Sequence, residues 1–452
     1  MDDVLAGNAG ADGVREVAQN PFQFGVRELL AICTPTADEV STALLRTKYK
    51  PGRKLTASYE LTIDGAGSRH ACVLWTAAPN PVRSDPAARP THTDRRGLHR
   101  DPAPGLAPLE ATSQDGRLKL LVAPGDPAFP QLRTLADPDQ LVTVLGRITG
   151  QTRPTPRAGD VRTVRYRPGQ RHVLLARPTP GHPGVFVKCD RDDSGRVAVP
   201  VARAMAPLVA DECPGVDIVE PVGYLEAERA AVWKRSPGAP LTHTLTERTG
   251  EVGDLVILLG RFLRTWHDSG HLVSRGLQRQ VVDRAARDVA GELRATHRAG
   301  ELIAVLRPDV WATYDAVLTE VTRALDALRC EAATLIHGDL KSDNVLVAGG
   351  RLHVLDLDRA AWADPALDLG KFMADLHWWC RDPATASGLG AAFRRGYGVT
   401  SPQRWARAGL ISVMYRLAFA ARRCAVHAPD WDKAVARRVD EAASALHGGW
   451  SR

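Results

Sequence analysis

The sequence has little lysine, no Cys-x-x-Cys pair and no long apolar run. Only 9 of its 452 residues are lysine, so arginine supplies most of the positive charge. The 7 cysteines are scattered and odd in number, a usage that fits reduced thiols in a cytosol. No segment approaches the roughly 20 apolar residues that cross a membrane, and the acidic N-terminus has no signal-peptide core. We therefore expect a cytoplasmic protein without a membrane partner.

Composition places the chain among globular proteins. Hydrophobic residues make up 44% and charged residues 25%, and the length allows two or three domains. The net charge is +7, which can accompany nucleic-acid binding. No run of lysine and arginine interleaved with aromatic residues is present, so we expect no nucleic-acid partner.

One segment carries most of the chemistry. Residues 335–358 read LIHGDLKSDNVLVAGGRLHVLDLD, in which Asn344 follows Asp339 by five positions and an apolar strand leads to Asp356. Phosphoryl transfer needs a carboxylate near the attacking hydroxyl and oxygen ligands for magnesium beside the phosphates. The order of these groups is that of a kinase catalytic loop. The alternative is a polar turn between two short strands.

The segment resembles the catalytic loop of the aminoglycoside phosphotransferase family, which also includes choline, homoserine and sugar kinases. The downstream run Asp364 to Leu369, DPALDL, resembles the DPA-x-DLA pattern of that family. The resemblance implies an enzyme that uses ATP and Mg²⁺ to phosphorylate a hydroxyl of a small molecule, such as an antibiotic or a sugar. It also implies the protein-kinase-like fold.

Within this resemblance, three side chains have direct roles. Asp339 is the candidate catalytic residue, which accepts or orients the proton of the acceptor hydroxyl. Asn344 and Asp356 are the candidate magnesium ligands, because a hard cation prefers oxygen.

Three further residues have supporting roles. His337 is expected to shape the loop by hydrogen bonds. Asp358 either supports the metal site or is a surface carboxylate paired with Arg359. Asp368 anchors the catalytic loop or caps a helix.

The nucleotide is expected to bind a β-rich lobe. Lys188 ends a strand-like run at 184–187 and is the candidate phosphate-binding lysine, although a solvent-facing lysine is the commoner case at a strand end. The turn at 167–172 contains Gly169, whose backbone NH would face the phosphates. Kinases pair the strand lysine with a glutamate on the next helix, yet residues 197–210 contain no acid.

A hinge is expected after the next strand pattern. The sequence AVWKR, followed by PGAPL, resembles the hinge strand and PG-x-PL turn of the family. Backbone groups of Trp233, Lys234 and Arg235 would then bind the adenine.

The expected fold class is α+β: a bilobal protein-kinase-like fold with a small β-rich N-lobe, a mainly helical C-lobe and an extra N-terminal α/β module. The expected divisions are a disordered tail at 1–20, a cap or duplicated half-lobe at 21–150 with a flexible loop at 79–108, a nucleotide-binding N-lobe at 151–241, and a catalytic and substrate-binding C-lobe at 242–452. Local patterns predict a helix near 37–46, strands at 54–63 and 70–76, and helices at 251–268 and 309–329.

A faint repeat links the two β-rich regions. Tyr49 to Arg53 reads YKPGR and Tyr166 to Arg171 reads YRPGQR, and a β-rich run follows each. The region is either a duplicated half-lobe of which only the second copy kept its lysine, or two unrelated Pro-Gly turns.

The acceptor is expected to be small. Only seven residues separate Asp356 from Asp364 and no APE anchor follows, so the long activation segment of protein kinases is missing. The basic balance of residues 391–452 favours a neutral or anionic acceptor. The alternatives are a pseudokinase or nucleotide-binding regulator, a nucleic-acid binder, and a metallohydrolase that uses His337, Asp339, His353 and Asp356.

Overall fold

The structure is a computed structural model that describes residues 1–65, 68–78, 109–149, 161–177, 184–247, 252–282 and 288–448. The loop expected at 79–108 lies outside the described residues. The chain divides into two compact units: an N-terminal unit of Met1–Arg133, Tyr166–Gly169 and Ala425–Pro429, and a C-terminal unit of Thr134–Arg165, Gln170–Cys424 and Asp430–Arg452. The first boundary thus falls after Arg133 rather than near residue 150.

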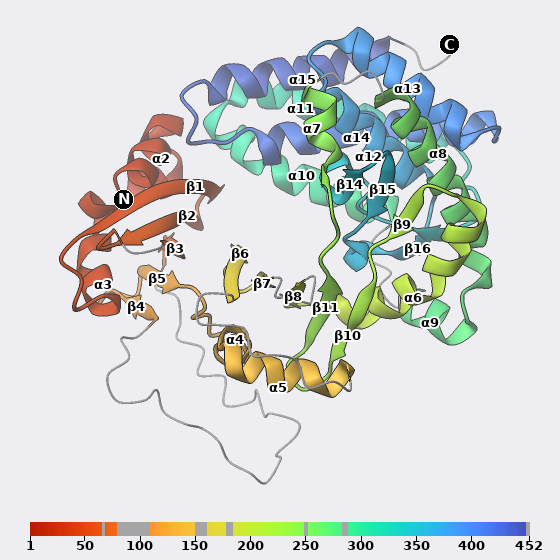
Figure 1. Cartoon of the computed structure of the whole chain (residues 1–452). Helices are drawn as coiled ribbons and strands as arrows, with labels where there is room; N and C mark the ends of the chain where they lie inside the picture. The colour runs from red at the N-terminus through yellow and green to blue at the C-terminus, as the bar shows by residue number, and fades with distance from the viewer. Residues whose placement is uncertain are drawn as a thin grey trace. The chain divides into compact units, whose positions relative to one another are not determined.

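The N-terminal unit contains an antiparallel sheet with the strand order β1-β2-β3-β5-β4, drawn in red to orange in Figure 1. Its strands are β1 (Val40–Lys50), β2 (Lys54–Ile63), β3 (Ser68–Thr76), β4 (Glu110–Thr112) and β5 (Leu118–Val122). The helices before it are α1 (Asp2–Ala6), α2 (Gly10–Gln19), η1 (Pro21–Phe24) and α3 (Val26–Cys33). The helix predicted near 37–46 is wrong, because the chain from Val40 onward forms β1, which pairs with β2.

The disordered tail predicted at 1–20 is also wrong. Val14 and Val17, one helical turn apart on α2, are fully buried. Two tyrosines of the sheet hold the helices: Tyr49 donates its hydroxyl to the carbonyl of Val4 at 2.9 Å, and Tyr59 donates to the carbonyl of Ala18 at 2.7 Å. The amphipathic pattern of this segment is weak in the sequence, because Gly, Ala and Asp interrupt its short apolar stripe.

The two Pro-Gly turns of the predicted repeat have similar backbones. Gly52 between β1 and β2 has φ 66°, and Gly169 between β6 (Val161–Arg167) and β7 (Arg171–Ala176) has φ 61°, a region that glycine adopts without strain. Leu74 lies opposite Thr56, four residues after Gly52, and Lys188 lies opposite Val173, four residues after Gly169. A duplication in which only the second copy has the lysine remains a hypothesis that this register supports.

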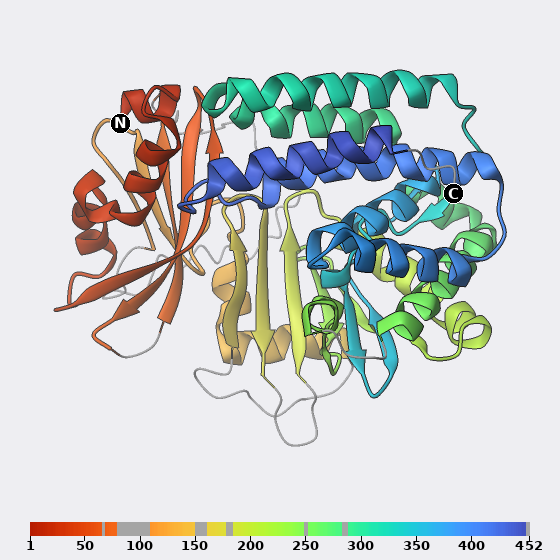
Figure 2. The same ribbon diagram turned by 90° about the horizontal axis from the view of Figure 1, so that it is seen from above.

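The C-terminal unit begins with a second five-stranded sheet, of order β10-β11-β8-β7-β6. Figure 2 shows its yellow strands side by side. Its other strands are β8 (Val185–Asp190), β10 (Pro221–Leu225) and β11 (Ala230–Lys234), and the associated helices are α4 (Leu132–Ala136), α5 (Pro138–Thr149) and α6 (Gly195–Glu212). Helix α6 starts tightly against β11: a Cβ added at Gly195 would lie 2.6 Å from the Cβ of Ala231.

A mainly helical part follows, so the predicted order of a small β-rich part and a helical part is confirmed. Its helices are α7 (Leu241–Glu247), α8 (Val252–Ser269), η2 (Gly270–Leu272), α9 (Arg275–Val282), α10 (Val289–Leu306), α11 (Pro308–Ala327), α12 (Ala366–Trp379), α13 (Pro383–Tyr397), α14 (Pro402–Arg423) and α15 (Trp431–His447). The predicted helices at 251–268 and 309–329 match α8 and α11 within two residues. Leu255, Leu259 and Phe262 of α8 are buried, as the predicted period requires.

Short strands among these helices carry the segment singled out in the sequence. They are β9 (Val216–Ile218), β12 (Ala239–Pro240), β13 (Thr334–Ile336), β14 (Val345–Ala348), β15 (Arg351–Val354) and β16 (Ala361–Ala363), with the turns η3 (Ser342–Asn344) and η4 (Leu357–Arg359). Strands β14 and β15 form a hairpin within a sheet of order β12-β14-β15-β9, and β13 pairs with β16. In the part of the chain that is described, no helix has both the length and the apolar character to span a membrane.

Candidate active site

The loop between β13 and β14 is held by a buried carboxylate of α12. Asp368 is fully buried, and its two oxygens accept the backbone NH groups of His337 at 2.7 Å and of Gly338 at 2.8 Å. His267 on α8 lies 3.3 Å from the same carboxylate. Burial alone would raise the pKa of Asp368, but the hydrogen bond with His267 and nearby imidazoles lower it. Asp368 therefore lies where the anchoring role predicted for it requires.

The loop also needs the glycine that precedes Asp339. Gly338 has φ 75°, and a Cβ added there would collide with the backbone carbonyl of Arg359. His337 is fully buried and lies 3.2 Å from the carbonyl of Leu355 through its Nε2. His337 thus joins the loop to the strand end that leads to Asp356, which agrees with a shaping role.

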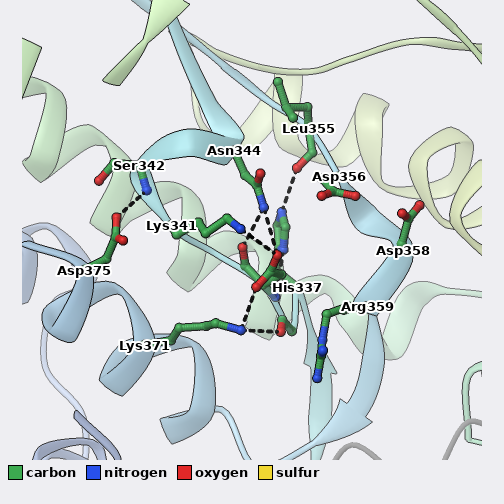
Figure 3. A network of polar contacts seen from close by, with 12 residues as sticks. His337, Lys341, Ser342, Asn344, Leu355, Asp356, Asp358, Arg359, Lys371 and Asp375 are labelled. Carbon is green, nitrogen blue, oxygen red and sulfur yellow. Dashed lines mark hydrogen bonds and ion pairs between the residues drawn. The ribbon is translucent and has the colours of Figure 1, made fainter. Parts of the chain in front are cut away.

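Asp339 lies between two lysines. Its Oδ1 is 2.6 Å from the Nζ of Lys371 on α12, and its Oδ2 is 3.2 Å from the Nζ of Lys341 in the loop (Figure 3). Burial alone would raise the pKa of Asp339, but the two ammonium groups more than offset it and lower the pKa. The carboxylate is therefore held in its ionised form. Lys341 is thus an ion-pair partner of Asp339.

Asn344 links Asp339 to the expected metal site. Its Nδ2 donates to the backbone carbonyl of Asp339 at 2.9 Å and to Oδ2 at 3.2 Å. This fixes the amide, so that the Asn344 oxygen points away from the Asp339 loop (Figure 3). The backbone NH of Leu355 donates to the carbonyl of Asn344 at 3.0 Å, which holds the backbone just before Asp356 next to Asn344.

The oxygen donors fit a magnesium site of the kind that also uses phosphate oxygens and water. The Asn344 amide and the Asp356 carboxylate supply oxygen only, as a hard cation requires. Asp356 has φ 68°, a left-handed conformation that non-glycine residues seldom adopt outside special sites. Among the described residues, no three His, Cys, Asp or Glu side chains gather as a metal-binding group, so a site built from the protein alone is not indicated there.

Lys188 meets the carboxylates at the end of this segment. Its Nζ is 2.6 Å from Oδ1 of Asp356 and also forms an ion pair with Asp358. Asp358 is 2% exposed, so it is not the surface carboxylate of the alternative reading. Lys188 therefore has carboxylate partners although α6 carries no glutamate at 197–210. These partners, Asp356 and Asp358, follow β15.

A second cation, Arg171, joins this cluster from the start of β7. Its guanidinium donates to Asp358 at 2.7 Å, lies 3.6 Å from Asp356, and pairs with the buried Asp190 of β8. Burial lowers the pKa of Arg171, but the three carboxylates raise it above the ordinary value. The cluster formed by Lys188, Arg171, Asp190, Asp356 and Asp358 is called the β-sheet charge cluster below.

Asp356 and Asp358 share Lys188, but their pKa values are shifted in opposite directions. Lys188 and Arg171 lower the pKa of Asp356 against the effect of burial. Burial raises the pKa of Asp358 to about 7; the carboxylates of Asp356 and Asp190 also raise it, against the lowering effects of Lys188 and Arg171.

The predicted phosphate turn and hinge have other backbone partners. The NH of Gly169 donates to Oδ2 of Asp126 at 2.8 Å. The NH of Lys234 donates to the carbonyl of Glu220 at 3.0 Å, and that of Arg235 to the carbonyl of Gly184 at 3.2 Å. These three backbone NH groups thus donate to acceptors within the protein. To bind ATP as predicted, each would have to break its present hydrogen bond.

The hinge strand itself is an inner strand. Trp233 of β11 lies opposite Phe186 on one side and Pro221 on the other, so β11 is paired on both sides. A purine contact of Trp233, Lys234 and Arg235 remains a prediction. His353 lies 3.6 Å from Asp217, a partner on β9, which removes it from the metallohydrolase set of His337, Asp339 and Asp356.

Sequence reasoning missed three charged residues of the site. Arg171 is the residue after the YRPGQ turn, and no pattern assigned it a role. Lys371 and Asp375 lie three and seven residues after Asp368, which is the spacing of one helix face. Asp375 accepts the backbone NH of Ser342 at 2.7 Å and pairs with Arg423 at 2.7 Å. One sequence signal could have identified Lys371 and Asp375: with Asp368, they repeat at helical spacing among mostly apolar residues.

The matched family model agrees with this geometry. Residues 186–410 match the model described as the phosphotransferase enzyme family, a segment that contains Lys188, Asp339, Asn344 and Asp356. No curated protein matches the chain.

Three similar solved structures are kinases. The GDP and kanamycin complex of APH(2")-IIia has 14% identity, covers 67% of this chain and 97% of its own, and has a TM-score of 0.48. Spectinomycin phosphotransferase APH(9)-Ia with ADP and spectinomycin has 14% identity, 68% and 97% coverage, and a TM-score of 0.47. Choline kinase from Cryptosporidium parvum has 8% identity, 69% and 96% coverage, and a TM-score of 0.48.

The matched segment runs from β8, with the lysine that meets Asp356, through the catalytic loop to α14. Through residues 186–410 the chain therefore belongs to the phosphotransferase enzyme family.

Proposed function

We propose that the protein uses ATP and Mg²⁺ to transfer the γ-phosphoryl group to a hydroxyl of a small molecule. The single observation that carries the proposal is the position of Asn344. Its side-chain Nδ2 donates to the backbone carbonyl and to Oδ2 of Asp339, and its backbone carbonyl accepts the NH of Leu355, the residue before Asp356. Asn344 is thus hydrogen-bonded to Asp339, the proposed partner of the acceptor hydroxyl, and to the residue before Asp356, the proposed metal ligand.

In the proposed reaction, Asp339 accepts a hydrogen bond from the acceptor hydroxyl and aligns its oxygen with the γ-phosphorus. As the new oxygen–phosphorus bond forms, the bond between the γ-phosphorus and the β–γ bridging oxygen breaks and ADP leaves. The hydroxyl proton passes toward Asp339. An ionised carboxylate at neutral pH is a weak base, so its main contribution is orientation while charge develops.

The other residues would hold the nucleotide. Asn344 and Asp356 would hold the magnesium ion, which neutralises charge on the phosphates when it is bound. Lys188 and Arg171 form ion pairs with Asp356, so both cations lie where they could turn to phosphate oxygens. Trp233 to Arg235 and Gly169 are retained as proposed contacts to the adenine and phosphates.

The acceptor is proposed to be a small neutral or anionic molecule rather than a polycation. After Asp356 the chain makes only the short turn η4 and strand β16 before α12, which supports a small acceptor. Lys341 and Lys371 both contact Asp339, and positive charge there disfavours an approaching polycation.

The test is a panel of acceptors screened for MgATP consumption. The panel would contain sugars, sugar acids, choline, kanamycin and spectinomycin, and ADP release would be measured for the wild-type protein, D339A and the exposed control D440A. We expect turnover with at least one acceptor, near-complete loss in D339A and no change in D440A. Turnover by D339A at the wild-type rate would reject Asp339 as the catalytic residue.

A nucleotide-binding regulator is the second candidate, because the amides of Gly169, Lys234 and Arg235 are engaged within the protein. It predicts MgATP binding, measured by calorimetry, without ADP release from any acceptor of the panel. Acceptor-dependent ADP release would reject it.

A further inference from the structure

We infer that Lys371 is a positioning residue that fixes the Asp339 carboxylate for the attack of the acceptor. This inference rests on the proposed function, since it assigns Lys371 a role in the same reaction. Neither the family resemblance nor the sequence patterns pointed to this lysine.

The first argument is that the Lys371 ammonium group has contacts on several sides. The Lys371 ammonium lies 2.6 Å from Oδ1 of Asp339 and 3.3 Å from the carbonyl of Gly338, to which it donates. Its Nζ also lies 4.8 Å from the centroid of the Tyr415 ring on α14, which is within cation–π range. The residue is 6% exposed. The ammonium group therefore meets a carboxylate, a carbonyl and an aromatic ring, and it has little freedom to move.

The second argument is the helix that carries it. Asp368, Lys371 and Asp375 lie on one face of α12 and each contacts a different part of the catalytic loop. Asp368 binds the amides of His337 and Gly338, Lys371 binds the Asp339 side chain, and Asp375 binds the amide of Ser342. The backbone is thus fixed on both sides of Asp339, and Lys371 adds the contact that sets the direction of the carboxylate itself.

The third argument is energetic. Burying an ammonium and a carboxylate costs desolvation free energy, and such a pair is often no more stabilising than apolar residues of the same shape. Stability alone therefore gives little reason to place a lysine here. A fixed direction for Oδ1 gives a reason, because a misplacement of about 1 Å in a reacting group can cost roughly a hundredfold in rate.

Lys341 contacts the same carboxylate but has a different setting. It belongs to the loop, its side chain is 21% exposed, and it lies 3.2 Å from Oδ2. During the reaction Oδ2 is the oxygen that receives the hydroxyl proton, and Lys341 can move aside toward the phosphate. Lys371 stays on Oδ1, keeps its own protons and takes no part in bond formation.

The experiment compares K371M, K371R and D339N, the double variant D339N/K371M, and K433M, which removes an exposed lysine of α15 as the matched control. MgATP turnover would be measured with the acceptor that the panel identifies, and with water as acceptor if the panel identifies none. We expect K371M to lower kcat by about 10²-fold with the KM for MgATP within about twofold. K371R should retain more activity than K371M, and K433M should match the wild type.

The double variant separates positioning from general structural damage. If Lys371 acts through Asp339, K371M should have no further effect on kcat in the D339N background. Additive losses would overturn the inference, as would wild-type kcat in K371M. Thermal melting and MgATP binding would check that each variant is folded, and K371Q replaces K371M if the latter does not fold.

The outcomes distinguish the two levels of the argument. A wild-type protein without turnover, or an active D339N, overturns the proposed function and this role with it. An inactive D339N together with a fully active K371M overturns only the role of Lys371.

Discussion

Two groups of carboxylates, some buried and some half-buried, are balanced differently in the C-terminal unit. At the Asp339 centre, one carboxylate meets the ammonium groups of two lysines, Lys341 and Lys371. In the β-sheet charge cluster, three carboxylates share the two cations Lys188 and Arg171. With every carboxylate ionised, the first centre has an excess of positive charge and the second an excess of negative charge. Because the pKa of Asp358 is raised to about 7, the negative excess of the second centre is complete only above that pH.

The difference matches the charge that each centre would meet. A cluster with surplus carboxylates is stabilised by a divalent cation, whereas a single carboxylate between two ammonium groups stays ionised and fixed without one. The comparison teaches that the two halves of the proposed phosphoryl-transfer site differ in charge balance before any ligand is bound.

The largest expected effects are a loss of MgATP affinity at the β-sheet charge cluster and a loss of kcat at the Asp339 centre. D356N should weaken MgATP binding by about 10²-fold, because a metal ligand is lost. D339N should leave MgATP affinity within a few-fold and lower kcat by about 10³-fold. Calorimetric titration with MgATP, and with ATP plus a chelator, together with ADP release would measure both. Equal losses of affinity in the two variants would break the comparison.

The next prediction concerns the anchor of the Asp339 centre. D368N places an amide NH₂ group against the backbone NH groups of His337 and Gly338, so it should lower the free energy of unfolding by about 3 kcal/mol at pH 7. The folded state holds the pKa of Asp368 below its ordinary value, so its ionisation stabilises the protein above about pH 4. That stabilisation is lost as the pH falls through the folded-state pKa.

Urea unfolding of wild type and D368N between pH 3 and pH 8 checks this sign. The difference between them should be constant above about pH 5 and should shrink below pH 4. A difference that grows at low pH would contradict the assignment of Asp368 as the ionised anchor.

A smaller effect is expected for the added cation of the β-sheet charge cluster. R171Q should weaken MgATP binding by about tenfold, the loss of one hydrogen bond to a charged partner. The matched control is R196Q, since Arg196 is about half exposed and pairs with Asp193 and Glu226 away from this cluster. Unchanged affinity in R171Q would leave Lys188 as the cation of this cluster that binds phosphate.

The smallest effect is expected at the more exposed lysine of the Asp339 centre. K341M should lower kcat by about threefold, because a partly exposed ion pair contributes less than about 1 kcal/mol. The loss should be well below that of K371M in the same assay. A larger loss in K341M than in K371M would reverse the roles assigned to the two lysines.

The sequence predicted the parts of the site that depend on local order. The loop from His337 to Asn344 and the strand leading to Asp356 form as expected, because their spacing fixes a turn and a hairpin within about twenty residues. The amphipathic period of α8 was equally local. The helices at residues 1–20 were not predicted, since Gly, Ala and Asp dilute their short apolar stripe and the tyrosines that hold them, Tyr49 and Tyr59, come from the sheet.

The sequence by itself determined the chemistry: a carboxylate, an amide and a second carboxylate in the order of phosphoryl transfer, with a lysine on an earlier strand. Only the tertiary structure decided which charges meet. Lys188 and Asp356 are 168 positions apart, Arg171 and Asp358 187 apart, and neither pair belongs to a shared local pattern. Ion pairs of this kind depend on how sheet and loop pack, because Coulomb energy depends on distance in space and not on separation along the chain.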